Sequence, residues 1–193
     1  MRRLLSLSVL AAIALGALSG SAMAARVSIS PSGAVRATAR SFVIEVMGSF
    51  SVNCEMVLSG ELNSRAAEGT LGVLGSIVIG RWTRATVANC AGGTMRVELL
   101  TAASISVNEV TNRTRAELWV LSMRILIEDG RNYRCLYDLL MVVRSRENPF
   151  TRLEFIAPTV LEVRTLAGSM ACSSTVRASG TFLLGAAVEL ILS

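Results

Sequence analysis

The chain has 193 residues, of which 52% are hydrophobic, and its 19 basic and 14 acidic residues give a net charge of +5. It contains no histidine and every basic residue is arginine, which excludes Ser-His-Asp, Cys-His, Ser-Lys and Schiff-base catalysis. This length favours a single domain. No nucleic-acid partner is expected, because the arginines are spread singly rather than clustered.

The first 24 residues have the three parts of a secretory signal peptide. Arg2 and Arg3 form a positive n-region, residues 4–18 are an apolar stretch, and Ala22-Met23-Ala24 fits a cleavage site. The apolar stretch is shorter than the roughly 20 residues that a membrane-spanning helix needs. The sequence therefore predicts a secreted or extracytoplasmic protein that starts at Ala25, has no transmembrane span and carries 17 arginines against 14 acidic residues.

Four cysteines form two widely spaced pairs, Cys54 with Cys90 and Cys135 with Cys172. In an oxidising compartment such cysteines form disulfides. A zinc site is disfavoured because there is no CxxC spacing and no histidine. Three connectivities are possible, and we expect the local one, Cys54–Cys90 with Cys135–Cys172. The two nearly equal intervals also predict two pseudo-similar halves, about 41–112 and 115–193, within one β-rich domain spanning 25–193.

From residue 26 to residue 100, apolar and polar residues alternate in several segments, as in strands with one buried face. Residues 26–30 predict a first strand, and residues 50–59 give the clearest pattern. Over residues 34–40 a helix is an open alternative, and residues 61–68 fit a helical turn or a loop. Residues 71–79 predict a strand that is buried on both faces, in which glycines mark bulges or a close approach of two backbones.

In the second half, residues 117–143 predict a β-hairpin. A three-residue loop over 128–130, with Gly130 left-handed, keeps the apolar face whole. In that register Met123 lies opposite Cys135, and Leu121 lies opposite Tyr137.

Two short strands split by Pro158, at 153–156 and 160–166, follow a turn at Asn148-Pro149, and residues 181–192 predict the last strand. About 10–12 short strands indicate an all-β, single-domain antiparallel sandwich or barrel that is stapled by two disulfides.

A carboxylate pair is the remaining type of catalytic site. The acidic residues that lie within predicted strands are Glu45, Glu55, Glu98, Glu117, Asp138 and Glu154. We interpret them as parts of solvent-facing strand surfaces. No catalytic residue, metal site or cofactor is therefore predicted.

A ligand-facing loop is one interpretation of the segment with Arg81, Trp82 and Arg84, because an aromatic side chain between two arginines suits carbohydrate binding. The alternative is that Trp82 covers an end of the core while the arginines extend over it into solvent. We prefer the alternative.

The pattern that runs from Phe50 through Cys54, Gly60, Cys90-Ala-Gly-Gly and Cys135-Leu-Tyr to Cys172 and Gly180-Thr-Phe resembles uncharacterised secreted β-rich proteins of GC-rich actinobacteria. The shared residues are cysteines and glycines that serve a scaffold, so the resemblance implies a fold and no activity.

These observations predict an exported, non-catalytic β-domain that is a binding or structural component of the cell envelope or extracellular space. Two kinds of partner are compatible with this function, a macromolecule of the envelope and a small apolar ligand. One alternative is a carrier of a small hydrophobic ligand in a β-barrel, because stretches such as 139–143 are apolar on both faces. A second alternative is a carboxylate-pair hydrolase.

Overall fold

The computed structural model describes residues 23–46, 50–71, 77–100, 103–107, 109–111, 115–145 and 147–192. These residues form strands and connecting turns without any helix, which confirms the all-β prediction. The strands are β1 (Met23–Ser30), β2 (Gly33–Val46), β3 (Phe50–Leu62), β4 (Ala67–Leu71), β5 (Ile77–Ala91), β6 (Thr94–Leu99), β7 (Ala103–Val107), β8 (Glu109–Thr111), β9 (Arg115–Glu128), β10 (Arg134–Ser145), β11 (Phe150–Thr165) and β12 (Val176–Leu192).

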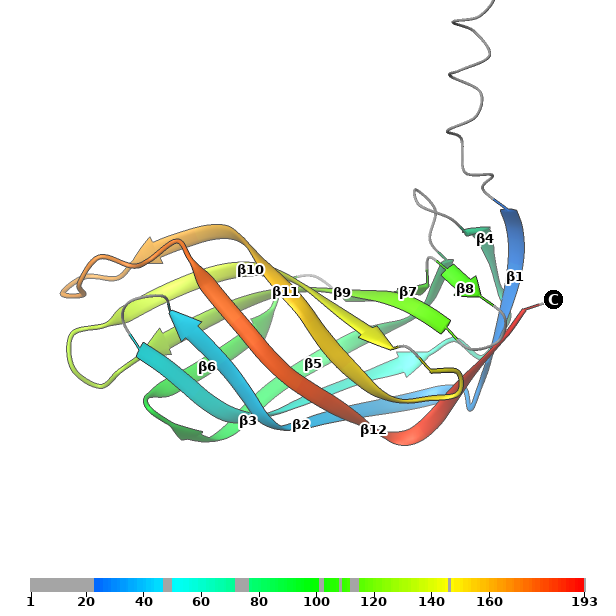
Figure 1. Ribbon diagram of the computed structural model, residues 1–193, viewed down its shortest axis with the longest axis horizontal. Coiled ribbons are helices and arrows are strands. Elements are labelled where there is room, and N and C mark those ends of the chain that lie inside the picture. Colours follow the sequence, from blue (N-terminus) through cyan, green and yellow to red (C-terminus); the bar gives the residue numbers. More distant parts are fainter. Residues whose placement is uncertain are drawn as a thin grey trace, which may run out of the picture.

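A single antiparallel path connects most of these strands, in the order β6-β9-β10-β11-β12-β2-β3-β5-β7 (Figure 1). The short strand β8 pairs with β9, and β1 pairs with both β12 and β4 at one end of the molecule. Strands from both predicted halves share this path, since β12 pairs with β2.

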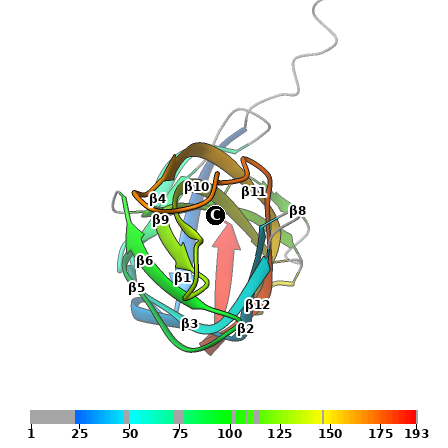
Figure 2. The ribbon, with the colours of Figure 1, turned by 90° about the vertical axis from the view of Figure 1, so that its left-hand side faces the viewer.

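The sheet curls around its own long axis, so that the strands surround a common interior (Figure 2). The two strands at the ends of the path, β6 and β7, each contact a strand from the other end. Strand β7 also lies against β9, and β6 also lies against β5. Large side chains fill the interior. The largest fully buried ones are Trp82, Tyr137, Phe42, Phe150 and Phe182. The core is therefore enclosed by one curled sheet, to which β1 and β4 add a small second sheet.

Strand β2 resolves the open choice between helix and strand over residues 34–40. Side chains alternate between buried and exposed along it, and Val35, Ala37 and Ala39 face the core. Strand β3 pairs with residues 33–39 of this segment, and β12 pairs with Ala37 and Thr38 on its other side, before a register irregularity interrupts both ladders. Pairing within the sheet thus decides the conformation of a segment whose local pattern is ambiguous.

The predicted register of the β9–β10 hairpin is wrong by four residues. Cys135 pairs with Ile127 and Tyr137 with Ile125, so Met123 lies opposite Leu139. The loop comprises residues 129–133, and Gly130 in it has the expected positive φ of 76°. An error of four residues preserves the side-chain alternation, because the period of a strand is two. The predicted apolar face was therefore correct, while the pairing within it was not.

Strand β11 is continuous where two strands split by Pro158 were predicted. Pro158 pairs with Met141 between two register irregularities of the β10–β11 ladder. Among the described residues, the ladder between β11 and β12 extends only from Phe150 to Glu154 on β11. Beyond it, β11 has a free edge, and a residue without an N–H group is tolerated there. Long strands are general in this fold, and six of the strands contain 13 to 17 residues.

The described part of the predicted strand 71–79 is not buried on both faces. Ile77 and Ile79 are buried, but Val78 is 50% exposed. The predicted close backbone approach occurs at Gly80, where a Cβ atom would overlap the carbonyl oxygen of Glu61. Gly72 and Gly75, for which the same role was predicted, lie outside the described residues, as do residues 1–22 of the predicted signal peptide.

Gly60 on β3 makes room for its neighbour Trp82 on β5. A Cβ atom at position 60 would overlap the carbonyl oxygen of Arg81 and lie 2.9 Å from Cε3 of Trp82. We expect Gly60→Ala to lower the free energy of unfolding by about 2–3 kcal/mol, as overpacking does in other cores. In urea denaturation, Gly185→Ala is the matched control, because its nearest neighbour is Arg36 O at 3.7 Å. Equal effects of the two variants would contradict the close approach of β3 and β5.

Both predicted disulfides, Cys54–Cys90 and Cys135–Cys172, are present. Their surroundings differ. The first joins strands β3 and β5, which are already paired at Asn53 and Ala91. The second joins strand β10 to the loop of residues 166–175 between β11 and β12.

No helix that could cross a membrane occurs in the part of the chain that the structure describes.

Candidate functional site

Trp82, the aromatic residue of the predicted ligand-facing loop, lies in strand β5 rather than in a loop. Its side chain has no exposed surface and belongs to the hydrophobic core. It pairs with Gly60 on one side and with Ala103 on the other. The interpretation of Trp82 as a core residue is therefore the one that the structure supports, and no ligand can reach it in this conformation.

Arg81 and Arg84 project from the outer face of the same strand, and both are exposed. Arg36 and Arg40 are exposed on the outer face of β2, two strands away. We refer to these four residues, together with the hydroxyl side chains of Thr38, Ser59, Thr83 and Thr86 between them, as the arginine face. The sequence did contain a signal for the β2 part of the arginine face, because Arg36, Thr38 and Arg40 alternate with small apolar residues.

The centre of the arginine face is a row across three neighbouring strands. Arg36 pairs with Ser59, and Ser59 pairs with Arg84. Because neighbouring strands lie 4.7–4.9 Å apart, the Cα atoms of the two arginines are separated by about 10 Å. The hydroxyl of Thr83 donates to the carbonyl oxygen of Ser59 at 3.2 Å. Arg36 and Arg84 thus flank the hydroxyl group of Ser59, with that of Thr83 close by.

The acidic residues near this face are already engaged. Glu61 accepts a hydrogen bond from Arg81 Nη2 at 3.2 Å, and Glu55 accepts one from Asn89 Nδ2 at 2.7 Å. For Arg36, Arg40 and Arg84, no ion pair within 4 Å occurs among the described residues. The face holds four arginines against two glutamates, so it carries two of the three excess positive charges of the predicted mature chain.

The carboxylates considered for catalysis are distributed over different strands. Glu45, Glu55 and Glu98 are exposed, on β2, β3 and β6, while Glu154 on β11 is half-buried. The side chain of Glu117 lies outside the described residues. Within the described residues, no group of three or more His, Cys, Asp or Glu side chains could hold a metal ion.

Among the described residues, Asp138 on β10 forms the less exposed of two bidentate contacts between an arginine and a carboxylate, the other being Arg164 with Glu162. Its two oxygens accept hydrogen bonds from Arg124 Nε at 2.8 Å and Arg124 Nη2 at 2.9 Å. This bidentate contact holds the pKa of Asp138 below its ordinary value, against the opposing effect of burial. Arg124 also lies opposite Glu98 on β6, and Asp138 opposite Glu162 on β11. The row thus contains the Arg124–Asp138 ion pair, next to the Arg164–Glu162 ion pair on β11, which is a structural arrangement.

The Arg124–Asp138 pair is expected to make stability depend on pH. The folded-state pKa of Asp138 is depressed, so its contribution is complete above the ordinary aspartate pKa of about 3.9 and is lost as the pH falls through the folded value. Unfolding measured between pH 7 and pH 2 should show that Asp138→Asn is less stable than the unmodified protein at pH 7, by an amount that shrinks as the pH falls. Glu162→Gln is the control, since its contact with Arg164 is about half exposed on both sides. A difference for Asp138→Asn that is as large at pH 2 as at pH 7 would contradict this assignment.

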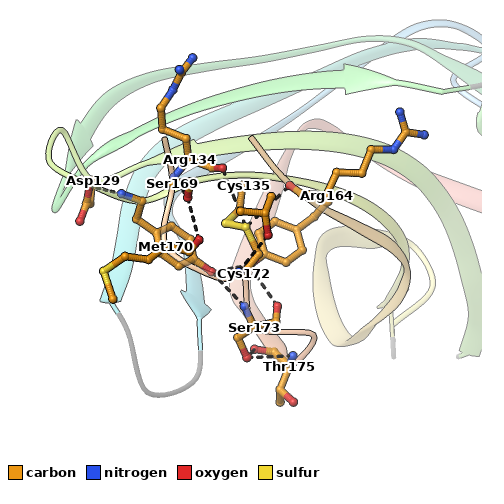
Figure 3. The surroundings of a disulfide bond; sticks show 12 residues. Asp129, Arg134, Cys135, Arg164, Ser169, Met170, Cys172, Ser173 and Thr175 are labelled. Atoms are coloured by element: carbon orange, nitrogen blue, oxygen red, sulfur yellow. Dashed lines mark hydrogen bonds between the residues drawn. A yellow bond between two sulfur atoms is a disulfide. The ribbon is translucent and has the colours of Figure 1, made fainter. Parts of the chain in front are cut away.

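The Cys135–Cys172 disulfide lies at the end of the molecule where the β9–β10 loop meets the 166–175 loop (Figure 3). Backbone hydrogen bonds join the two loops, from Met170 N to Asn132 O at 2.8 Å and from Leu166 N to Arg134 O at 3.1 Å. The hydroxyl of Ser169 accepts a further bond from Arg134 N at 2.8 Å. The 166–175 loop is therefore fixed along its length, although it contains no regular structure.

A pair of buried tyrosines supports this loop from inside. The hydroxyls of Tyr133 and Tyr137 are 2.7 Å apart. Tyr137 donates to Ser173 O at 3.1 Å, and Ser173 N donates to the Tyr133 hydroxyl at 3.3 Å. Burial, and next the bond to Tyr133, raise the pKa of Tyr137 above its ordinary value, so it stays neutral. The network closes one end of the core, and sequence reasoning missed it because residues 133 and 173 are 40 positions apart.

The chain matches no protein-family model, and neither the curated proteins nor the solved structures contain a significant match to it.

Proposed function

We propose that this protein is an exported, non-catalytic β-domain that acts as a binding or structural component of the cell envelope or extracellular space. The observation that carries the proposal is the arginine face: exposed cationic and hydroxyl groups displayed on a rigid scaffold. Two disulfides and a filled core stabilise that scaffold. The backbone that displays this surface is already ordered in its strands, so binding a partner does not carry the cost of ordering it.

Features of both the sequence and the structure favour binding over catalysis. The chain has neither histidine nor lysine, and all four cysteines are engaged in disulfides. Asp138, the less exposed carboxylate of the two bidentate arginine contacts, is held in its ionised form by Arg124. An ionised carboxylate in a bidentate ion pair is unsuited to act as a general acid.

The decisive experiment is intact and native mass spectrometry of the full chain after expression in a bacterial host. We expect the protein in the periplasm or medium, starting at Ala25 and lighter by four hydrogens than the reduced chain. Recovery from the cytoplasm with residues 1–24 and free thiols would overturn the proposal of export. A retained apolar molecule would instead favour the carrier. If the protein hydrolysed a glycan and Glu154→Gln or Glu98→Gln abolished that activity, the result would favour the hydrolase.

A further inference from the structure

We infer that the arginine face binds a linear glycan that carries carboxylate groups. This inference rests on the proposed function, because it names the partner class of an exported binding domain. It concerns the outer surface of β2, β3 and β5, with the row Arg36–Ser59–Arg84 at its centre.

The first argument is charge. Arginine presents a planar fork of N–H donors that fits a carboxylate in a bidentate manner. Arg36 and Arg84 are exposed, and no acidic side chain among the described residues forms an ion pair with either. Their separation of about 10 Å across three strands is comparable to the length of a disaccharide. Carboxylates on alternate sugars of a linear chain could therefore engage both arginines.

The second argument is the chemistry between the arginines. Thr38, Ser59 and Thr86 lie on the outer face in the same and the next row of the sheet. Their hydroxyls both donate and accept hydrogen bonds, as sugar hydroxyls do. Val57, between Thr38 and Thr86, is half-buried and offers a small apolar contact to a sugar face. The surface therefore complements a polymer with both charges and hydroxyl groups.

The third argument concerns which anionic polymers fit. Proteins that bind single-stranded nucleic acids combine a positively charged groove with aromatic side chains on which the bases stack. On the outer face of the described parts of β2, β3 and β5, there is no aromatic side chain, since Phe42 and Trp82 point into the core. Phe50, the first residue of β3, packs edge-on against Tyr133. Recognition must then come from charge and hydrogen bonds, which favours an anionic glycan.

The test measures binding of the oxidised, processed protein to polygalacturonate, a linear glycan with one carboxylate on each sugar. Dextran serves as a neutral glycan, and a 30-nucleotide oligo-dT as a nucleic acid. We expect binding to polygalacturonate that weakens as salt rises from 50 to 200 mM, and much weaker binding to both other probes. The double variant Arg36→Gln/Arg84→Gln should bind about tenfold more weakly, as loss of a charge-assisted hydrogen bond predicts.

Arg131→Gln/Arg177→Gln is the matched control. It removes the same charge from exposed positions, at the β9–β10 loop and at the start of β12. We expect less than a twofold change, and unchanged thermal unfolding for both double variants. If both double variants bound polygalacturonate more weakly by the same factor, net charge alone would explain the effect, and the inference would be overturned. Tighter binding of oligo-dT, equal binding of dextran or no binding of polygalacturonate would also overturn it. In each of these cases, export and disulfide formation are measured separately by mass spectrometry. Those results would still support the proposed function, so its failure and the failure of this inference are distinguishable.

Discussion

Replacing Cys135 and Cys172 together by alanine is expected to lower the free energy of unfolding by about 4 kcal/mol and to loosen the 166–175 loop. The bond closes an interval of 37 residues. In the chain-entropy model, the stabilisation comes from the restricted unfolded chain. A loss of this size is a large part of the 5–15 kcal/mol that typically stabilises a domain.

The other disulfide provides an internal comparison, because Cys54–Cys90 closes an interval of 36 residues. The unfolded-state contribution of the two bonds is therefore nearly the same. In the folded state, Cys54 and Cys90 lie on strands that their own ladder holds together, whereas Cys172 lies in an irregular loop. Both double variants should lose similar stability, but only the removal of Cys135–Cys172 should change the native state locally.

Hydrogen exchange distinguishes these effects. The amides of Met170, Cys172 and Ser173 are hydrogen-bonded to Asn132 O, Thr165 Oγ1 and the Tyr133 hydroxyl. They should exchange faster by at least tenfold in the variant without Cys135–Cys172, and at the unmodified rate in the variant without Cys54–Cys90. Unchanged exchange in both variants would show that the hydrogen bonds alone hold the loop.

Trp82→Ala is the second change with a large expected effect, a loss of about 3–5 kcal/mol in the free energy of unfolding. The side chain is the largest of those that are fully buried, so truncation leaves a cavity that the rigid strands around it fill only in part. Denaturation in urea or guanidinium measures the loss, with the midpoint and the slope reported separately.

Leu183→Ala is the control for this experiment, because Leu183 is 54% exposed on β12. We expect its effect to stay within about 0.5 kcal/mol, as for other surface substitutions. A loss below about 1 kcal/mol for Trp82→Ala would mean that the indole is not packed in the core. It would restore the interpretation of Arg81, Trp82 and Arg84 as a ligand-facing loop.

Several features of this protein could be predicted from the sequence because they depend on local pattern. Alternation along residues 50–59 predicted the inward face of β3, with Val52, Cys54 and Met56 buried. The near-equal cysteine intervals predicted both disulfides. A period of two and a short sequence separation are recorded directly in the order of the residues, so no knowledge of the partner strand was needed.

Other features depend on which segments meet in space. The β9–β10 register was wrong by four residues because alternation fixes the face of a strand but not its position along the neighbour. The arginine face arises only when β3 lies between β2 and β5, which brings Arg36 beside Ser59 and Ser59 beside Arg84. The tyrosine pair under Ser173 likewise joins residues about 40 positions apart. The sequence by itself determined most strands, the buried faces of those that alternate, and the disulfides. The pairing of distant strands decided the conformation of residues 34–40 and the candidate binding surface, because a strand's pattern does not record its neighbour.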